Sequence, residues 1–271
     1  MGQNSKQFSP KEIAQAVGAS ESSVKRWADS GQLAFTRTVG GHRRIALPEA
    51  IRFAREANLP IVRPDILGLP DLSLAQERVE ADSDLGNLIF EALLNGQSED
   101  VRALIVERYL AGDALHTLCD GPIRNALQRI GEIWKHESRG IAIEHRATDI
   151  CIQALSVLRS YIATDRDDAP LALGGAPQGD PYILPSMMAS AVLAETGLRD
   201  RNLGPNMPTE AMISEVQYTI PALVWLSFSV RGQIERMTTE LGRLLDVTDE
   251  LGTNVIVGGR GLAAPLPRSP A

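Results

Sequence analysis

Eight side chains within the first part of the chain are of the kinds that contact nucleic acids. Short hydroxyls and cations reach base edges and backbone phosphates in the grooves of duplex DNA. The eight residues are Ser22, Ser23, Lys25, Arg26, Arg37, His42, Arg43 and Arg44. Residues 1–60 carry nine Lys/Arg and five Asp/Glu, a net charge of +4, whereas the rest of the chain carries −11. Only the basic segment is therefore a candidate for contact with phosphate.

The pattern around these residues predicts two short helices followed by a hairpin. Ser9-Pro10-Lys11-Glu12 has the form of a capping box with proline in the first turn, which predicts a helix over 10–17. A turn at 18–20 ends in a new N-cap, Ser20, and a second helix runs from there to Gly31. Residues 36–45 place a Gly-Gly turn between two extended segments, which predicts a basic hairpin, and a third helix opens at Pro48. We assign residues 1–60 to one domain.

Residues 7–60 resemble the winged-helix DNA-binding domains of the MerR family. In that family a stretch like FSPKEIAQAVGASESSVKRWADSGQL leads into a GGHRR wing. The resemblance implies that the helix around Ser22 to Arg26 is the recognition helix. It also implies that the wing cations, Arg37, His42, Arg43 and Arg44, hold backbone phosphates or enter the minor groove. Domains of this family read two half-sites, so at least a dimer is expected.

Helical periodicity dominates the middle of the chain. Residues 58–82 contain three prolines and no sustained period, so we expect a linker over 61–82 with about one helical turn. Residues 83–165 then carry apolar residues at helical spacing in four stretches, the second capped by Ser98 and the third interrupted at Gly121-Pro122. Four antiparallel helices with short connections predict a four-helix bundle.

From residue 169 short apolar segments alternate with amphipathic ones. The expected strands are Leu171–Leu173, Arg199–Leu203, Ala222–Ser229 and Asn254–Val257. Alternation of strand and helix predicts a parallel sheet, so residues 169–262 should form a truncated Rossmann-like (flavodoxin-like) domain, followed by a Pro-rich tail over 263–271. A ligand would enter at the carboxyl ends of the strands. The predicted fold class is thus multidomain α and α/β.

The order of the three domains resembles the cobalamin-dependent regulators of the CarH and LitR type. The cap bundle of that family carries a Trp followed at a fixed separation by Glu-His, and here Trp134 stands at the same separation before Glu144-His145. The α/β domain of that family carries Asp-x-His-x-x-Gly, then Ser-x-Leu, then Gly-Gly, at characteristic separations. Here the segment from Asp180 to Pro185, Ser227-Phe228-Ser229 and Gly258-Gly259 preserve those separations. The candidate cofactor-binding residues are Trp134, Glu144, His145, Asp180, Tyr182, Ser227, Gly258 and Gly259.

The sequence departs from this family at the positions that carry its chemistry. Tyr182 stands where the family has the His that ligates cobalt, and Pro185 stands where it has the Gly that lets the nucleotide tail approach. Lys135 takes the place of the His that follows the Trp in light-sensing members, and His136 lies one position later. A neutral phenol is a poorer cobalt ligand than an imidazole, so we expect His-ligated cobalamin binding to be lost. No metal site is predicted.

We therefore expect a transcription regulator that binds double-stranded operator DNA through residues 7–60, as a dimer or tetramer and with no cofactor. The cap bundle and the α/β domain, together called the body, would serve oligomerisation or bind a partner protein. The alternatives are a ligand-gated or light-responsive sensor that binds cobalamin without the His, haem or a bilin, and a corrinoid carrier protein for a methyltransferase. An enzyme is not expected, because no catalytic constellation stands out. Cys119 and Cys151 lack the spacing of a zinc site or a disulfide framework, and no apolar run could span a bilayer, so a bacterial cytoplasmic, nucleoid-associated protein without membrane contact is expected.

Overall fold

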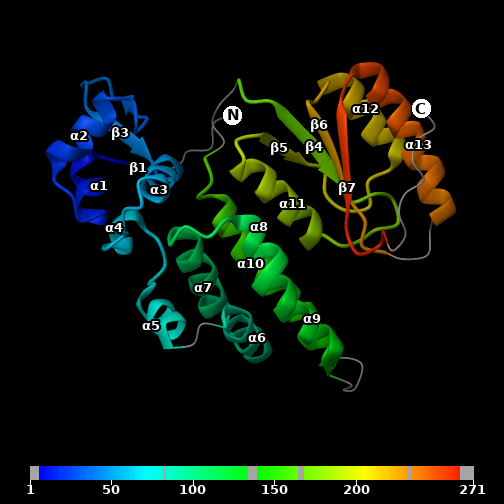
Figure 1. Cartoon of the computed structure of the whole chain (residues 1–271), viewed down its shortest axis with the longest axis horizontal. Helices are drawn as coiled ribbons and strands as arrows, with labels where there is room; N and C mark the ends of the chain where they lie inside the picture. Colours follow the sequence, from blue (N-terminus) through cyan, green and yellow to red (C-terminus); the bar gives the residue numbers. More distant parts are fainter. Residues whose placement is uncertain (1–5, 82–83, 134–138, 164–167, 231–233, 263–271) are drawn as a thin grey trace. The chain divides into compact units, whose positions relative to one another are not determined.

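The computed structural model describes residues 6–81, 84–133, 139–163, 168–230 and 234–262 (Figure 1). The chain divides into two compact units, Met1–Ala163 and Thr164–Ala271. The first unit is built from helices and a small antiparallel sheet, and the second is a parallel sheet with helices on both faces. Among the described residues, no helix is long and apolar enough to cross a membrane. The prediction of a mixed α/β protein with a parallel sheet is confirmed.

The segment from Lys6 to Ala57 forms a small module around one apolar core. Its elements are β1 (Gln7–Phe8), α1 (Pro10–Ala16), α2 (Glu21–Asp29), β2 (Thr36–Arg37), β3 (Arg43–Ala46) and α3 (Leu47–Glu56). The strands pair antiparallel in the order β1-β3-β2. The predicted capping box is present, because the Ser9 hydroxyl accepts from the Glu12 N–H and the Glu12 carboxylate accepts from the Ser9 N–H. The core side chains are Phe8, Ile13, Val24, Leu33, Ile45 and Ile51.

The segment after this module holds more structure than predicted. It contains two helices, α4 (Pro64–Leu67) and α5 (Ser73–Ala81), instead of a linker with one helical turn. Leu67, Leu72 and Ala75 are buried, and Arg78 forms an ion pair with Asp100. Helix α5 follows a stretch with three prolines, a composition that is typical of a linker.

Four longer helices make up the predicted bundle. They are α6 (Leu85–Asn95), α7 (Ser98–Leu110), α9 (Arg124–Ile133) and α10 (Gly140–Arg159), which pack against one another. A short α8 (Leu115–Leu118) runs through a π-helical turn, η1 (Cys119–Ile123), into α9, and this turn contains Pro122 where the interruption was predicted. The prediction that Ser98 caps α7 is wrong, since Gln97 is the N-cap and no side chain bonds there.

Arg55, in the last turn of α3, joins the module to the bundle. Its guanidinium carbon lies 3.7 Å from the centre of the Tyr109 ring of α7. Both terminal nitrogens donate to the carbonyl oxygen of Asp113 at 3.1 Å. A planar guanidinium that stacks and donates at once holds its partner in one orientation.

The second unit is a four-stranded parallel sheet. Its strands are β4 (Leu171–Gly175), β5 (Arg199–Asn202), β6 (Leu223–Ser227) and β7 (Asn254–Gly258), in the order β5-β4-β6-β7. The connecting helices are α11 (Leu184–Glu195), α12 (Thr209–Thr219) and α13 (Ile234–Leu251), and α11 covers one face while α12 and α13 cover the other (Figure 1). The core under α12 and α13 contains Leu173, Met212, Val224, Leu226 and Leu244. All four expected strands and their connecting helices are therefore present.

Candidate functional site

Helix α2 presents a polar face made of hydroxyls and cations. The hydroxyls of Ser22 and Ser23 lie 2.8 and 2.9 Å from the hydroxyl of the N-cap Ser20. The Lys25 ammonium pairs with Glu21 one turn earlier, at 2.7 Å. The Arg26 side chain is exposed and forms no ion pair among the described residues. The predicted face therefore exists, and Arg26 is its least engaged cation.

The hairpin is attached to the end of α2 through Arg43. The Arg43 guanidinium pairs with Asp29 in the last turn of α2, and the Arg43 side chain is only 21% exposed. Arg37 and Arg43 also lie over the same Phe35 ring, at 5.2 and 5.4 Å from its centre. Arg43 thus positions the hairpin beside α2, a role that sequence reasoning missed because Asp29 belongs to another element, distant along the chain.

The remaining hairpin cations are less constrained. The Arg37 guanidinium donates to the Gly41 carbonyl at 3.1 Å, which closes the turn. His42 is exposed, and its main-chain N–H donates to the Thr38 hydroxyl at 3.2 Å. Arg44 lies 3.9 Å from the Glu12 carboxylate, and this carboxylate has a lowered pKa mainly because it accepts from the N–H and hydroxyl of Ser9.

The second candidate site lies in the α/β unit, at the carboxyl ends of its strands. Asp180, in the loop after β4, is 3% exposed. One of its carboxylate oxygens accepts from the main-chain N–H of Tyr182 at 3.1 Å, and the other accepts from the N–H groups of Ser229 and Val230 after β6. A buried carboxylate satisfied by three N–H donors ties two loops together.

The loop after β5 joins the same arrangement. The Asn206 side chain accepts from the Gly179 N–H at 2.7 Å, and the Asn206 N–H donates to the Asp180 carbonyl at 2.8 Å. Asn206 adopts a φ of 54°, which asparagine tolerates better than most residues. Three loops from different strands are therefore bonded into one surface, and nothing in the spacing pointed to Asn206.

The loop after β7 completes this surface through glycines. The Phe228 N–H donates to the Gly258 carbonyl, and the Gly261 N–H donates to the Phe228 carbonyl. Gly259 has a φ of 113°, and a Cβ there would lie 2.1 Å from the Phe228 carbonyl oxygen. Gly258, by contrast, has open space where a Cβ would stand. The close approach of the main chains at residues 228 and 259 therefore requires a glycine, and no ligand is needed to explain it.

Tyr182 and Arg260 stand together on this surface. Tyr182 is 42% exposed, and the Arg260 guanidinium carbon lies 5.1 Å from the centre of its ring. Arg260 Nε donates to the Ser229 carbonyl at 3.3 Å. The structure therefore brings together Asp180, Tyr182, Gly258 and Gly259, with Ser227 buried at the end of β6. Arg260 was missed, although it directly follows the Gly-Gly pair.

Trp225 fills the space above Gly174 on the α11 face of the sheet. A Cβ on Gly174 would lie 2.3 Å from the Trp225 indole. Trp225 is 3% exposed, and its Nε1–H is buried without a hydrogen-bond partner among the described residues. The Trp225 indole therefore occupies the space beside Gly174.

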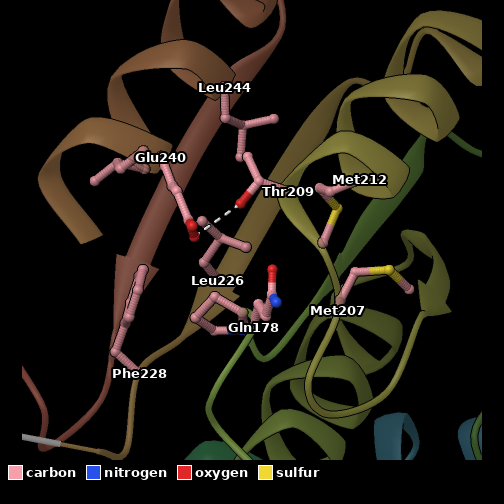
Figure 2. Close-up of a pocket in the computed structure, with 10 residues that line it drawn as sticks. Gln178, Met207, Thr209, Met212, Leu226, Phe228, Glu240 and Leu244 are labelled. Atoms are coloured by element: carbon pink, nitrogen blue, oxygen red, sulfur yellow. Dashed lines mark hydrogen bonds between the residues drawn. The ribbon is translucent and has the colours of Figure 1, made fainter. Parts of the chain in front are cut away.

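A small cavity lies on the opposite face, between α12 and α13 (Figure 2). Its volume is about 30 Å³, and the Thr209 hydroxyl donates to Glu240 across it at 3.1 Å. The apolar part of its wall includes Met207, Met212, Leu226, Phe228 and Leu244. This space suits one or two water molecules and is too small for a tetrapyrrole.

Three predicted cofactor residues belong to the helical part of the chain. Trp134 lies outside the described residues. Glu144 and His145 are in the first turns of α10, where His145 Nε2 lies 3.8 Å from the Glu144 carboxylate and the His145 side chain is 78% exposed. No group of three or more His, Cys, Asp or Glu that could hold a metal occurs in the part of the chain that the structure describes. Cys119 and Cys151 are buried and form no disulfide with a described residue, and burial raises the pKa of the Cys151 thiol to about 12.

The bundle is the part of the chain that a known family matches. Its helices α6, α7, α9 and α10 and the π-helical turn between them fall within one continuous segment. Residues 86–159 match the family described as B12 binding domain. The B12-binding match thus covers the predicted cap bundle and stops before the α/β unit.

The fold of a solved corrinoid protein is similar to that of about two-thirds of this chain. The monomethylamine corrinoid protein of Methanosarcina barkeri has a TM-score of 0.51 and 17% identity, over 65% of this chain and 84% of its own. A cobalamin-binding protein from Desulfitobacterium hafniense has a TM-score of 0.33 and 16% identity, over 66% of this chain and 84% of its own. No curated protein sequence matches the chain. Because so few residues are identical, the first similarity concerns the fold alone.

The α/β unit offers no imidazole that could ligate a corrinoid, because residues 164–271 contain no histidine. Tyr182 supplies a phenol stacked with Arg260, and the Asp180 carboxylate is occupied by three main-chain donors. The Trp225 ring occupies the space left by Gly174. Loss of His ligation stays a prediction, and the B12-binding match keeps cobalamin as a candidate ligand.

Proposed function

We propose that this chain is a DNA-binding transcription regulator of the MerR type attached to a B12-binding-type body. The observation that carries the proposal is the pairing of two basic surfaces, the polar face of α2 and the hairpin that Arg43 holds against Asp29. A helix whose exposed face carries short hydroxyls and cations suits base edges and phosphates, and a basic hairpin beside it suits the neighbouring backbone.

The charge distribution supports the same proposal. The net charge of +4 on residues 1–60 would attract the phosphate backbone, although the whole chain is acidic. Charges on the acidic body are screened beyond about 10 Å at ordinary ionic strength, so they would weaken DNA binding little. Within the module Arg26, His42 and Arg44 are proposed to contact DNA directly, whereas Arg43 is proposed to act mainly by positioning the hairpin.

Fluorescence anisotropy with a labelled duplex of about three helical turns, measured from about 50 to 200 mM salt, tests this proposal. We expect Arg26→Ala to weaken binding about ten-fold and to reduce the salt slope by about one, since each phosphate contact contributes about 0.9. Arg63→Ala is the matched control, because Arg63 is an exposed arginine that pairs with Asp65 outside the module. Equal affinities and slopes for the two variants would refute the proposed DNA surface.

A second experiment separates a direct contact from a positioning role in the hairpin. Asp29→Asn removes the partner of Arg43 and leaves every cation of the hairpin in place. If Arg43 acts by positioning, this variant should lose about as much affinity as Arg43→Gln, with little change in salt slope. If Arg43 acts as a phosphate contact, Asp29→Asn should bind DNA more tightly than the wild type.

The body is proposed to provide oligomerisation or a protein-binding surface, with no catalysis assigned to it. A second candidate function, corrinoid carriage or cobalamin sensing, is favoured by the B12-binding match and by the shared corrinoid-protein fold. Absorption spectra after incubation with adenosylcobalamin, hydroxocobalamin, haem or biliverdin, followed by desalting, distinguish these functions. Stoichiometric retention of either cobalamin favours the second candidate, and retention of haem or biliverdin favours a sensor of that pigment. A colourless protein that binds DNA favours the first candidate.

A further inference from the structure

Strand β7 is an edge strand without the usual protection of an edge. It pairs with β6 on one side and with no strand of the described residues on the other. Its sequence, Asn-Val-Ile-Val-Gly, has neither a charge nor a proline, and Ile256 is 55% exposed. Natural edge strands normally carry charges, prolines or bulges that prevent pairing with another chain. An apolar edge of this kind is typical of a strand that is paired in the working assembly.

The main-chain groups available at this edge follow from the β6–β7 ladder. The Asn254 N–H donates to the Ala222 carbonyl, and the Gly258 carbonyl accepts from the Phe228 N–H. Residues 254, 256 and 258 therefore direct their main-chain groups toward β6. Because these directions alternate along a strand, Val255 and Val257 direct their N–H and C=O groups outward.

The residues around Ile256 are symmetric, with a valine on each side. We propose that β7 pairs antiparallel with β7 of a second copy of this chain, about a two-fold axis at Ile256. Val255 of one copy then exchanges both main-chain bonds with Val257 of the other, which gives four hydrogen bonds in total. The two Ile256 residues form the central pair without hydrogen bonds, in which side chains approach most closely. The sheet would continue across both chains.

Charge at the two ends of β7 favours the antiparallel direction. Asp246, Asp249 and Glu250 lie near the end of α13, just before β7, and the last turn of α13 contains no cation. Negative charge at a helix C-terminus is unfavourable unless a cation lies nearby. Arg260 is exposed shortly after the end of β7. Antiparallel pairing brings Arg260 of each copy to the acidic end of the other, whereas parallel pairing would bring like charges together.

This contact does not depend on DNA binding, although it would supply the two-fold symmetry that two half-sites need. A strand this short buries less than the roughly 800 Å² per partner of a standard interface, so we expect a dimer with a Kd in the micromolar range. Sedimentation velocity on the full-length protein from low to high micromolar concentration, without DNA, should show this dimer.

Because Ile256 pairs with itself, charge substitutions test the axis directly. Ile256→Lys and Ile256→Glu should each raise the dimer Kd at least ten-fold, and an equimolar mixture of the two should restore a dimer. Tyr218→Lys is the matched control, since Tyr218 is an 85% exposed aromatic residue of the same unit, and it should leave the Kd unchanged. A dimer Kd that neither Ile256→Lys nor Ile256→Glu raises would overturn the proposal.

A crosslinking experiment covers the case in which a charged variant fails to fold. Ile256→Cys should form an intermolecular disulfide in oxidised glutathione, because the Cα atoms of such a pair lie about 4.5 Å apart. Asn254→Cys should not, since antiparallel pairing separates the two copies of residue 254 by about 14 Å. Both native cysteines are buried and do not compete. Equal crosslinking of the two variants, or none with Ile256→Cys, would refute the register.

Discussion

The Asp180 carboxylate offers the sharpest test of how the carboxyl ends of the sheet are held. Replacing it with alanine leaves the N–H of Ser229 buried without an acceptor, which costs about 2–3 kcal/mol for a bond to a charged group. The Val230 bond is longer, 3.3 Å, and the Tyr182 residue is partly exposed, so water can replace part of both bonds. We therefore expect Asp180→Ala to lower the free energy of unfolding by about 3 kcal/mol.

Trp225 is the one tryptophan in residues 164–271, so its fluorescence reports on the α/β unit alone once Trp27 and Trp134 are replaced by phenylalanine. In that background, with a urea m-value of about 2 kcal/mol/M, Asp180→Ala should lower the unfolding midpoint by about 1.5 M. The matched control is Asp246→Ala, an exposed aspartate of α13, which should change the midpoint by less than about 0.3 M. A loss below about 1 kcal/mol for Asp180→Ala would refute the inference that this carboxylate ties the loops together.

Three further predictions concern the loop glycines, the first helix and the thiols. Gly259→Ala places a methyl group against the main chain of Phe228, after β6, and should lower the free energy of urea unfolding by about 3 kcal/mol. Gly258→Ala should change it by less than about 0.5 kcal/mol. Equal effects of the two variants would contradict the close approach of Gly259 to Phe228. The folded protein lowers the pKa of Glu12, so the ionised carboxylate stabilises the fold at pH values above its ordinary pKa of 4.5, and this stability is lost as pH falls through the lower folded value. Glu12→Gln should therefore lower the free energy of unfolding by about 0.5 kcal/mol at pH 7 and leave it unchanged near pH 2. Acid titration of unfolding measures both values. Cys119 and Cys151 should resist Ellman's reagent in the folded protein at pH 8 and react once urea unfolds it; rapid reaction of native protein would contradict their burial.

Several elements of this fold were predictable because local chemistry sets them. The capping box at Ser9, the N-cap Ser20 and the interruption at Gly121-Pro122 act within a few residues, and the structure has each of them. Helix α5 was missed because Pro60, Pro64 and Pro70, shortly before it, are typical of a linker. Its position depends on contacts with α7, such as the Arg78–Asp100 pair, that no local pattern reveals.

The candidate site was predictable in its location and not in its bonding. Alternating strands and helices place Tyr182 and Gly258 at the same edge of the sheet, as observed. Two of the three donors to Asp180 come from residues 229 and 230, beyond two further strands, and the partner of Arg43 comes from another element. Such partners are set by tertiary packing, so residue type alone cannot show whether a charge faces solvent or holds two loops together.

The bonded loops at the carboxyl ends of the strands also affect how this unit could acquire a ligand during evolution. Fixing a flexible residue costs about 1–2 kcal/mol in backbone entropy. In this unit the hydrogen bonds of Asp180 and Asn206 already fix the loops when the chain folds, so a ligand does not have to order them. A molecule that binds at this edge meets a main chain already in place, so its recognition falls to the few exposed side chains there, Tyr182 and Arg260 among them. A descendant of this chain could acquire a ligand by exchanging those side chains, while the loops that carry them stay unchanged.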